Sequence, residues 1–164
     1  MNTDAPSFDK AKNKALNILS RRMHTQKELF DKLLRAGFGE ELACEVCTWA
    51  CEYGFINDKE YARAYIQSCI ASKKYGIKRV KQALLYKGVD AYTIEDIICE
   101  FDFCEKDALI SLVEKKLGGN FERKNIDKTI RHFIARGYEF SDIKNAISSI
   151  KEEFDFGKDD GFEI

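Results

Sequence analysis

The sequence predicts an all-α fold built from three tandem three-helix bundle repeats, stacked into an elongated, curved molecule. The single proline of the 164 residues, Pro6, precedes the first periodic segment, so no later helix carries a proline kink. Most of the ten glycines stand singly between amphipathic stretches, which is typical of helices joined by short turns. In addition, one short segment recurs three times along the chain.

The recurring segment has two adjacent apolar residues, a pair with at least one base, a glycine and another apolar residue. Its copies lie at 33–38, 84–89 and 133–138, and their glycines are 51 and 49 residues apart (88 − 37 and 137 − 88). A glycine that adopts the left-handed conformation commonly ends a helix, and the apolar residue after it closes a hydrophobic contact. We therefore predict three helix ends of one kind.

Apolar residues continue nine, ten and thirteen positions after each glycine, a spacing that faces one side of a helix. Another amphipathic stretch precedes each glycine segment, so each repeat is expected to hold three helices. The downstream set is Val46, Cys47, Ala50, Ile97, Ile98, Phe101, Ala146, Ile147 and Ile150. The upstream set is Leu16, Leu19, Tyr61, Ala62, Tyr65, Ile66, Cys69, Leu109, Leu112, Val113 and Leu117.

Helix-start residues and the repeats together suggest domain boundaries. The expected caps are Thr25 with Glu28 as a capping box, Asn57 or Asp58, Asp90, and Asn125 for the middle helix of the third repeat. We expect a disordered N-terminus over 1–7, repeats over 8–56, 57–104 and 105–156, and an acidic tail over 157–164.

Composition narrows the class of protein. With 45% hydrophobic and 34% charged residues, the chain is neither disordered nor a membrane protein. No apolar run approaches the roughly 18–20 residues that span a bilayer. The first residues lack a basic segment followed by an apolar one, so we expect a cytoplasmic protein without a secretory signal.

The six cysteines do not predict disulfides in a cytosolic chain of this length. Cys44, Cys47 and Cys51 share one helix face, but a metal site would need a fourth ligand. We interpret Cys47 as a core residue, because it matches apolar residues in the other repeats, and Cys44 and Cys51 as nearer the surface. A redox- or metal-responsive regulator that uses these three thiols is an alternative, and we expect no cofactor and no bound metal.

Motifs of catalysis are missing from the sequence. There is no Walker-type phosphate loop, no His-Glu-x-x-His and no Gly-x-Ser-x-Gly. The two histidines, His24 and His132, lie on different segments and are interpreted as surface or packing residues. We therefore expect that the protein is not an enzyme.

Charge is distributed unevenly although the net charge is only −1. Residues 57–89 carry eight bases and two acids, a balance of +6, whereas residues 90–103 carry five acids and no base. The basic stretch at 73–81 spans a turn and a helix start, where exposed amides add to the lysines as an anion site. It can hold a phosphate backbone or an acidic protein face, or it is a solvated helix surface.

Several segments, taken in order, resemble the RecX family, regulators of the RecA recombinase. They are 15–22, 25–29 with 32–33 and 37–38, 53–66, 76–80, and 84 with 87–89. The likeness is strong over 15–89 and weaker in the third unit. It implies the tandem three-helix units already predicted from the repeats.

The resemblance implies a non-enzymatic regulator that binds the RecA filament on single-stranded DNA, in its helical groove. It would limit filament extension, ATPase activity, strand exchange and co-protease activity, and so regulate recombination, DNA repair and the SOS response. A helical module that binds single- or double-stranded DNA directly is the alternative, since paired helices with a glycine turn resemble a helix-turn-helix. We expect a monomer without a membrane partner. The expected basic surface is Lys73, Lys74, Lys78, Arg79, Lys81, Lys87, Arg21, Arg22, Lys32 and Arg35.

Overall fold

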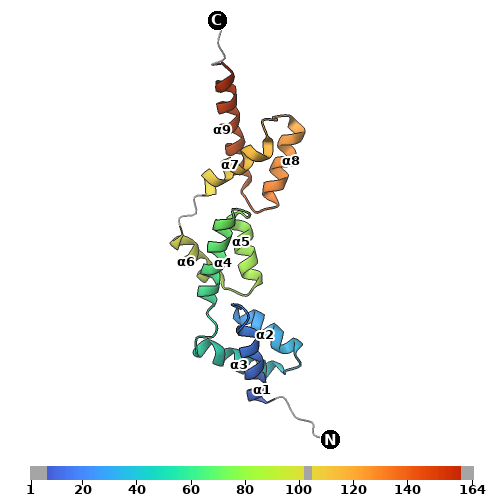
Figure 1. Ribbon diagram of the computed structural model, residues 1–164, viewed down its shortest axis with the longest axis vertical. Coiled ribbons are helices and arrows are strands. Elements are labelled where there is room, and N and C mark those ends of the chain that lie inside the picture. Colours follow the sequence, from blue (N-terminus) through green and yellow to red (C-terminus); the bar gives the residue numbers. More distant parts are fainter. Residues whose placement is uncertain (1–6, 102–104, 160–164) are drawn as a thin grey trace. The chain divides into compact units, whose positions relative to one another are not determined.

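The computed structural model describes the backbone of residues 7–101 and 105–159, and the side chains of 7–101 and 106–153. This part of the chain consists of helices joined by turns and contains no strand, which confirms the all-α prediction (Figure 1). The helices are α1 (Phe8–Leu19), α2 (Gln26–Arg35), α3 (Glu40–Glu52), α4 (Asp58–Ser72), α5 (Ile77–Tyr86), α6 (Ala91–Glu100), α7 (Glu105–Leu117), α8 (Arg123–Ile134) and α9 (Phe140–Asp159). Helix α9 runs past the boundary at 156 that the sequence suggested. Cys104, Asp160 and Glu163 lie outside the described residues.

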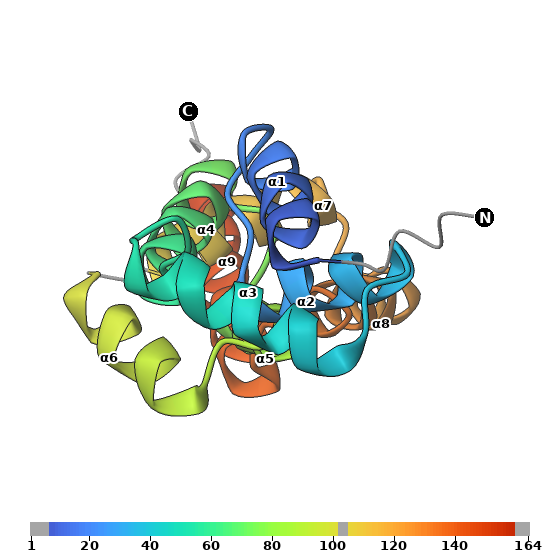
Figure 2. The same ribbon diagram turned by 90° about the horizontal axis from the view of Figure 1, so that it is seen from below.

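Two compact units make up the structure. One comprises the described residues up to Ile66 together with Ala83–Glu100, and the other comprises Gln67–Gln82 and the described residues from Phe101 onward. The division passes through α4 and α5. Within the first unit, α1, α2 and α3 pack on one another, as both ribbon views show (Figures 1 and 2). Within the second unit, α7, α8 and α9 do the same.

All three predicted helix ends have one geometry. Gly37, Gly88 and Gly137 have φ angles of 89°, 90° and 88°, the left-handed region that favours glycine. In each case the next residue donates its amide to a carbonyl five residues back, at 3.1–3.2 Å; in the first copy Phe38 N donates to Leu33 O. This is the hydrogen bond of a Schellman motif, and the prediction from the repeat is confirmed.

The expected core positions are also largely confirmed. Of the nine residues predicted downstream of the glycines, seven are buried, and Ile98 and Phe101 are half-buried. In α1 the prediction was less accurate, because Ala11 and Ala15 are fully buried whereas Leu16 and Leu19 are only half-buried. Small residues there allow α1 to approach its neighbours closely, and Leu19 packs at the margin of the core.

Most predicted caps form. The side chains of Thr25, Asn57 and Asp90 accept backbone amides three residues on, at 2.8–3.1 Å. The prediction for Asn125 was wrong, since α8 begins before it, at Arg123. Its amide nitrogen donates instead to the carbonyl oxygens of Leu117 and Asn120, which ties down the end of α7.

Candidate functional site

The start of α2 and the end of α5 form a joint within the first unit. The hydroxyl of Thr25 donates to the carbonyl oxygen of Lys87 at 2.6 Å, and the ammonium of Lys87 donates to the carboxylate of Glu28 at 2.6 Å. Gly88 permits this approach, because a Cβ atom there would lie 2.5 Å from the Cβ of Lys27. Glu28 is therefore used in the joint and in a contact with Arg22, rather than in the reciprocal half of a capping box.

A joint of the same kind lies within the second unit, between the start of α5 and the end of α8. Gly76 donates its amide to the carbonyl oxygen of Arg136 at 2.9 Å, and the guanidinium of Arg79 donates to that of Ala135 at 2.8 Å. Lys78 pairs with Glu139 at 2.6 Å. Thr25 and Gly76 are equivalent positions, since each stands twelve residues before a motif glycine (37 − 25 and 88 − 76).

Electrostatics within the first joint favour the ionised pair. Burial acts to raise the pKa of Glu28, but hydrogen bonds from Lys87 and Arg22 outweigh it and hold the pKa below its ordinary value. Burial acts to lower the pKa of Lys87, and hydrogen bonds to Glu28 and Tyr61 raise it above its ordinary value. Lys87 is thus a structural residue of the joint more than an open surface charge.

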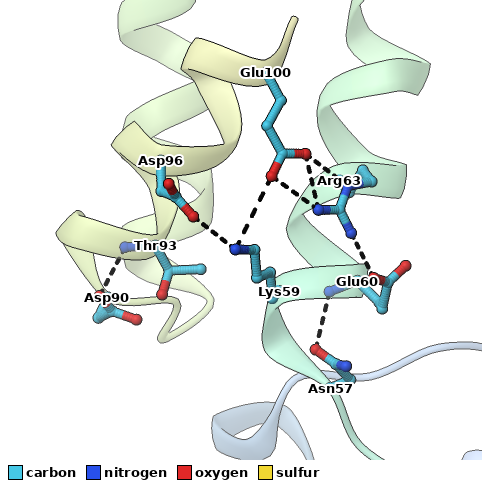
Figure 3. Close-up of polar contacts among 8 residues, drawn as sticks. All are labelled: Asn57, Lys59, Glu60, Arg63, Asp90, Thr93, Asp96 and Glu100. Carbon is cyan, nitrogen blue, oxygen red and sulfur yellow. Dashed lines mark hydrogen bonds and ion pairs between the residues drawn. The ribbon is translucent and has the colours of Figure 1, made fainter.

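The acidic helix α6 neutralises part of the basic segment before it. Figure 3 shows Lys59 and Arg63 on α4 pointing toward Asp96 and Glu100 on α6. Lys59 lies 2.6 Å from Asp96, and the guanidinium of Arg63 meets both oxygens of Glu100 at 2.8–3.0 Å. The excess of +6 that the sequence places on 57–89 is therefore not all available to a partner.

Two hollows combine basic residues with no carboxylate among their described lining residues, whereas a third, at the first joint, also contains Glu28 and Asp31. The first, of about 500 Å³, lies in the first unit between α1 and α2. Its lining contains four of the predicted residues, Arg21, Arg22, Lys32 and Arg35, and also Lys14, which sequence reasoning missed. Lys14 lies one helical turn from Ile18 on α1, but its nearness to Lys32 and Arg35 depends on how α1 lies against α2, which helical periodicity does not specify.

The second hollow lies in the second unit, at the joint, and has a volume of about 360 Å³. Lys74, Arg79 and Arg136 line it together with His132 and Tyr75. The guanidinium of Arg79 lies 4.9 Å from the centre of the Tyr75 ring, a cation–π contact. Cations and an accessible aromatic ring are therefore combined in one small surface.

The other predicted residues are dispersed. Lys73 is exposed and has a φ angle of 50° in the turn after α4. The carbonyl oxygen of Lys73 accepts a hydrogen bond from the hydroxyl of Tyr138 at 3.4 Å, which fixes this turn against the third repeat. Lys81 is half-buried on α5.

The thiols of α3 lie as expected from the repeat. Cys47 is buried, Cys44 is exposed and Cys51 is half-buried. Burial raises the pKa of the Cys47 thiol to about 12, and burial also raises the pKa of Cys51. Within the described residues, no three His, Cys, Asp or Glu side chains gather as a metal site would require. Across the same residues, no helix has both the length and the apolar character needed to cross a bilayer.

Comparison with known proteins identifies the family. Residues 11–49 match the model described as RecX, first three-helix domain, and residues 57–97 match RecX, second three-helix domain. The regulatory protein RecX of Caldanaerobacter subterraneus subsp. tengcongensis is 34% identical over 140 residues, which cover 84% of this chain and 69% of that protein. The chain belongs to the RecX family.

Further members of the RecX family agree. Regulatory protein RecX of Streptococcus gordonii is 32% identical over 93% of this chain, which spans 60% of that relative's length. The crystal structure of RecX from Lactobacillus salivarius superposes with a TM-score of 0.76 at 28% identity, over 88% of this chain and 96% of that one. The relatives are named regulatory proteins, which points to a non-enzymatic role.

Proposed function

We propose that this chain is a cytoplasmic, monomeric regulator of the RecA recombinase. It binds the RecA filament on single-stranded DNA, in the helical groove, and limits filament extension. ATPase turnover, strand exchange and co-protease activity fall as a result, which restrains recombination, DNA repair and the SOS response. Membership of the RecX family supports the proposal, together with the segments of residues 15–89 that resemble that family.

The observation that carries the proposal is the presence of exposed cations in both units. Lys73 and Lys74 lie on the surface of the second unit, and the hollow of α1 and α2 adds Arg21 and Arg35 in the first. A nucleoprotein filament is a polyanion, so separate basic patches steer association and position the regulator. Contact through two linked units gives tight binding without one deep pocket, because the second contact is intramolecular.

The test is the single-stranded-DNA-dependent ATPase of the cognate RecA, measured while this protein is added in substoichiometric amounts. We expect turnover to fall at a small fraction of the RecA concentration. The variant Lys73→Ala/Lys74→Ala should need more protein for the same inhibition. The variant Lys115→Ala/Lys116→Ala removes the same charge from exposed positions on α7 and should behave as wild type. No effect of the wild-type protein at equimolar concentration would contradict the proposal.

A direct nucleic-acid-binding module is the second candidate. The hollow that combines Lys74, Arg79 and Arg136 with Tyr75 favours it, since cations hold phosphates and an aromatic ring stacks on bases. This candidate predicts that the protein binds a single-stranded oligonucleotide without RecA and that affinity falls steeply with salt through counterion release. Fluorescence anisotropy over a salt series measures both quantities.

A further inference from the structure

The hollow between α1 and α2 has a lining of one charge sign. Among its described lining residues there are five bases and no carboxylate: Lys14, Arg21, Arg22, Lys32 and Arg35. Its volume of about 500 Å³ falls within the roughly 300–1,000 Å³ that is usual for ligand sites. Like charges that converge on one space repel one another, so this arrangement is stabilised when an anion occupies it.

Four of these five cations have no ion pair or side-chain hydrogen bond in the described part of the chain. Arg22 is the exception, because it meets Glu28 at 2.9 Å. Some bases elsewhere on the surface do pair with a carboxylate, as Lys59 does with Asp96 and Lys78 with Glu139, each at 2.6 Å. Within the described residues, a carboxylate thus neutralises only one of the five charges that line this hollow.

A buried histidine with one unpaired ring nitrogen lies beside these bases. His24 lines the same hollow and is only 4% exposed. Its Nδ1 lies 2.8 Å from the carbonyl oxygen of Arg22, which can only accept, so Nδ1 carries the proton. The second nitrogen, Nε2, is buried and has no hydrogen-bond partner. In this tautomer Nε2 is an acceptor, and protonation of the ring would turn it into a hydrogen-bond donor beside the five bases.

We propose that this hollow is a binding site for a run of adjacent phosphate groups, as in a nucleoside triphosphate or a nucleic-acid backbone. Charge density decides between anions: one carboxylate matches one of the five bases, whereas two or three linked phosphates match several within the same volume. The guanidinium groups of Arg21 and Arg35 donate in pairs to phosphate oxygens, and Lys14 and Lys32 act as point charges. His24, once protonated, donates from Nε2 to the same anion.

The test uses the purified full chain without RecA, so its outcome is separate from that of the regulatory proposal. Isothermal titration calorimetry with inorganic triphosphate is the first measurement, and a short single-stranded oligonucleotide is the second probe. We expect Arg21→Ala/Arg35→Ala to weaken binding by about tenfold or more, since both donors are lost. Lys115→Ala/Lys116→Ala, which makes the same change of charge, should bind as wild type does. Urea unfolding of each variant confirms that the fold is intact.

The probe that binds more tightly identifies the source of the phosphates, free nucleotide or nucleic-acid chain, and either result supports the site. As a second readout, the ring nitrogen signals of His24 should shift in NMR spectra when the tighter probe is added. Equal loss of binding in the α7 control would mean that only the overall charge is sensed, and would overturn the proposal. Absence of binding by both probes to the wild-type chain would overturn it as well.

Discussion

The hydroxyl group of Thr25 donates a hydrogen bond of 2.6 Å to the carbonyl oxygen of Lys87, 62 residues further along the chain. The same oxygen atom accepts the amide of Glu28 at 3.1 Å, so one buried hydroxyl both caps α2 and holds the end of α5. Thr25 is thus both a local helix cap and a long-range contact between α2 and the end of α5 in the first unit.

Replacement of Thr25 by valine should destabilise the first unit more than loss of a cap alone. Valine keeps the shape but leaves the amide of Glu28 and the carbonyl of Lys87 without this partner, a cost of about 1–3 kcal/mol. Thr25→Ser, which keeps the hydroxyl, should lose much less. Urea unfolding followed by circular dichroism gives both values, and equal stability of the two variants would show that the hydroxyl does not hold the joint.

The second joint predicts an unusually sensitive glycine. A Cβ atom at Gly76 would collide with the backbone of Gly137 and lie 2.7 Å from the amide nitrogen of Tyr138. Because backbone cannot move aside as a flexible side chain does, Gly76→Ala should cost about 1–3 kcal/mol through overpacking. Gly39→Ala is the matched control, since that glycine also precedes a helix and nothing lies within 4 Å of its Cβ position. Its cost should stay within about 1 kcal/mol. Thermal unfolding of both variants makes the comparison.

The ion pairs of α4 and α6 predict salt-dependent protection of α6. Arg63→Glu should place two carboxylates together at Glu100 and speed amide exchange along α6. The double variant Arg63→Glu/Glu100→Arg restores opposite charges and should recover part of the protection. Hydrogen exchange measured at low and high salt tests this, because screening removes the difference between wild type and variants. Identical exchange in all three proteins would mean that apolar burial of Ile94 and Ile97 alone holds the helix.

Thiol reactivity should follow burial along α3. Burial raises the pKa of Cys47 to about 12, so at neutral pH it holds almost no thiolate and is sterically covered. Among the three thiols of α3, the exposed Cys44 should react with a maleimide first. Mass spectrometry of partly labelled, digested protein gives the order, and urea should make Cys47 reactive. Rapid labelling of native Cys47 would contradict its placement in the core.

Acidification should destabilise the first unit through His24. Burial lowers the pKa of His24 from its ordinary 6.5, with Arg22 and Lys32 acting in the same direction and Glu28 and the hydrogen bond to Arg22 opposing. Below pH 6.5 the unfolded chain therefore binds more protons than the folded one, and stability falls as the pH drops through the lowered pKa. In the His24→Gln variant, the free energy of unfolding should fall less than in the wild type when the pH drops from neutral to below 6.5. Urea unfolding at each pH measures this difference.

His132 provides the control for this pH dependence. Burial lowers its pKa too, helped by Arg136 and Lys116, but its ring is less covered than that of His24. His132→Gln should therefore remove a smaller part of the slope. If His132→Gln reduced the pH dependence of stability more than His24→Gln does, His24 would not be its main source.

Much of the fold follows from local patterns. The three glycine turns were predictable because a Schellman motif is specified within six consecutive residues. Burial of Cys47 followed from its match with Ile98 and Ile147 in the other repeats, which is also local information. Asn125 misled the prediction, because an asparagine near a helix start can serve the end of the preceding helix equally well.

The joints and the charge pairing could not be predicted in the same way. Glu28 satisfies the spacing of a capping box, yet its carboxylate contacts Lys87, and no periodicity relates the two residues. Similarly, the basic count of 57–89 does not reveal that Lys59 and Arg63 face acids of α6. The cationic hollow depends on how α1 lies against α2, so Lys14 became visible only in three dimensions.

The two joints occupy equivalent positions but use different chemistry. The first relies on a threonine hydroxyl and an ammonium–carboxylate pair, whereas the second relies on a glycine amide and a guanidinium that reaches a carbonyl. Threonine could not replace Gly76 in the second joint, because a Cβ atom there would lie 2.7 Å from the amide nitrogen of Tyr138, and glycine at position 25 would lack the hydroxyl that holds Lys87. The repeats are consequently not interchangeable. A shuffled or duplicated repeat would form its joint only if the contacting residues on both sides were changed together.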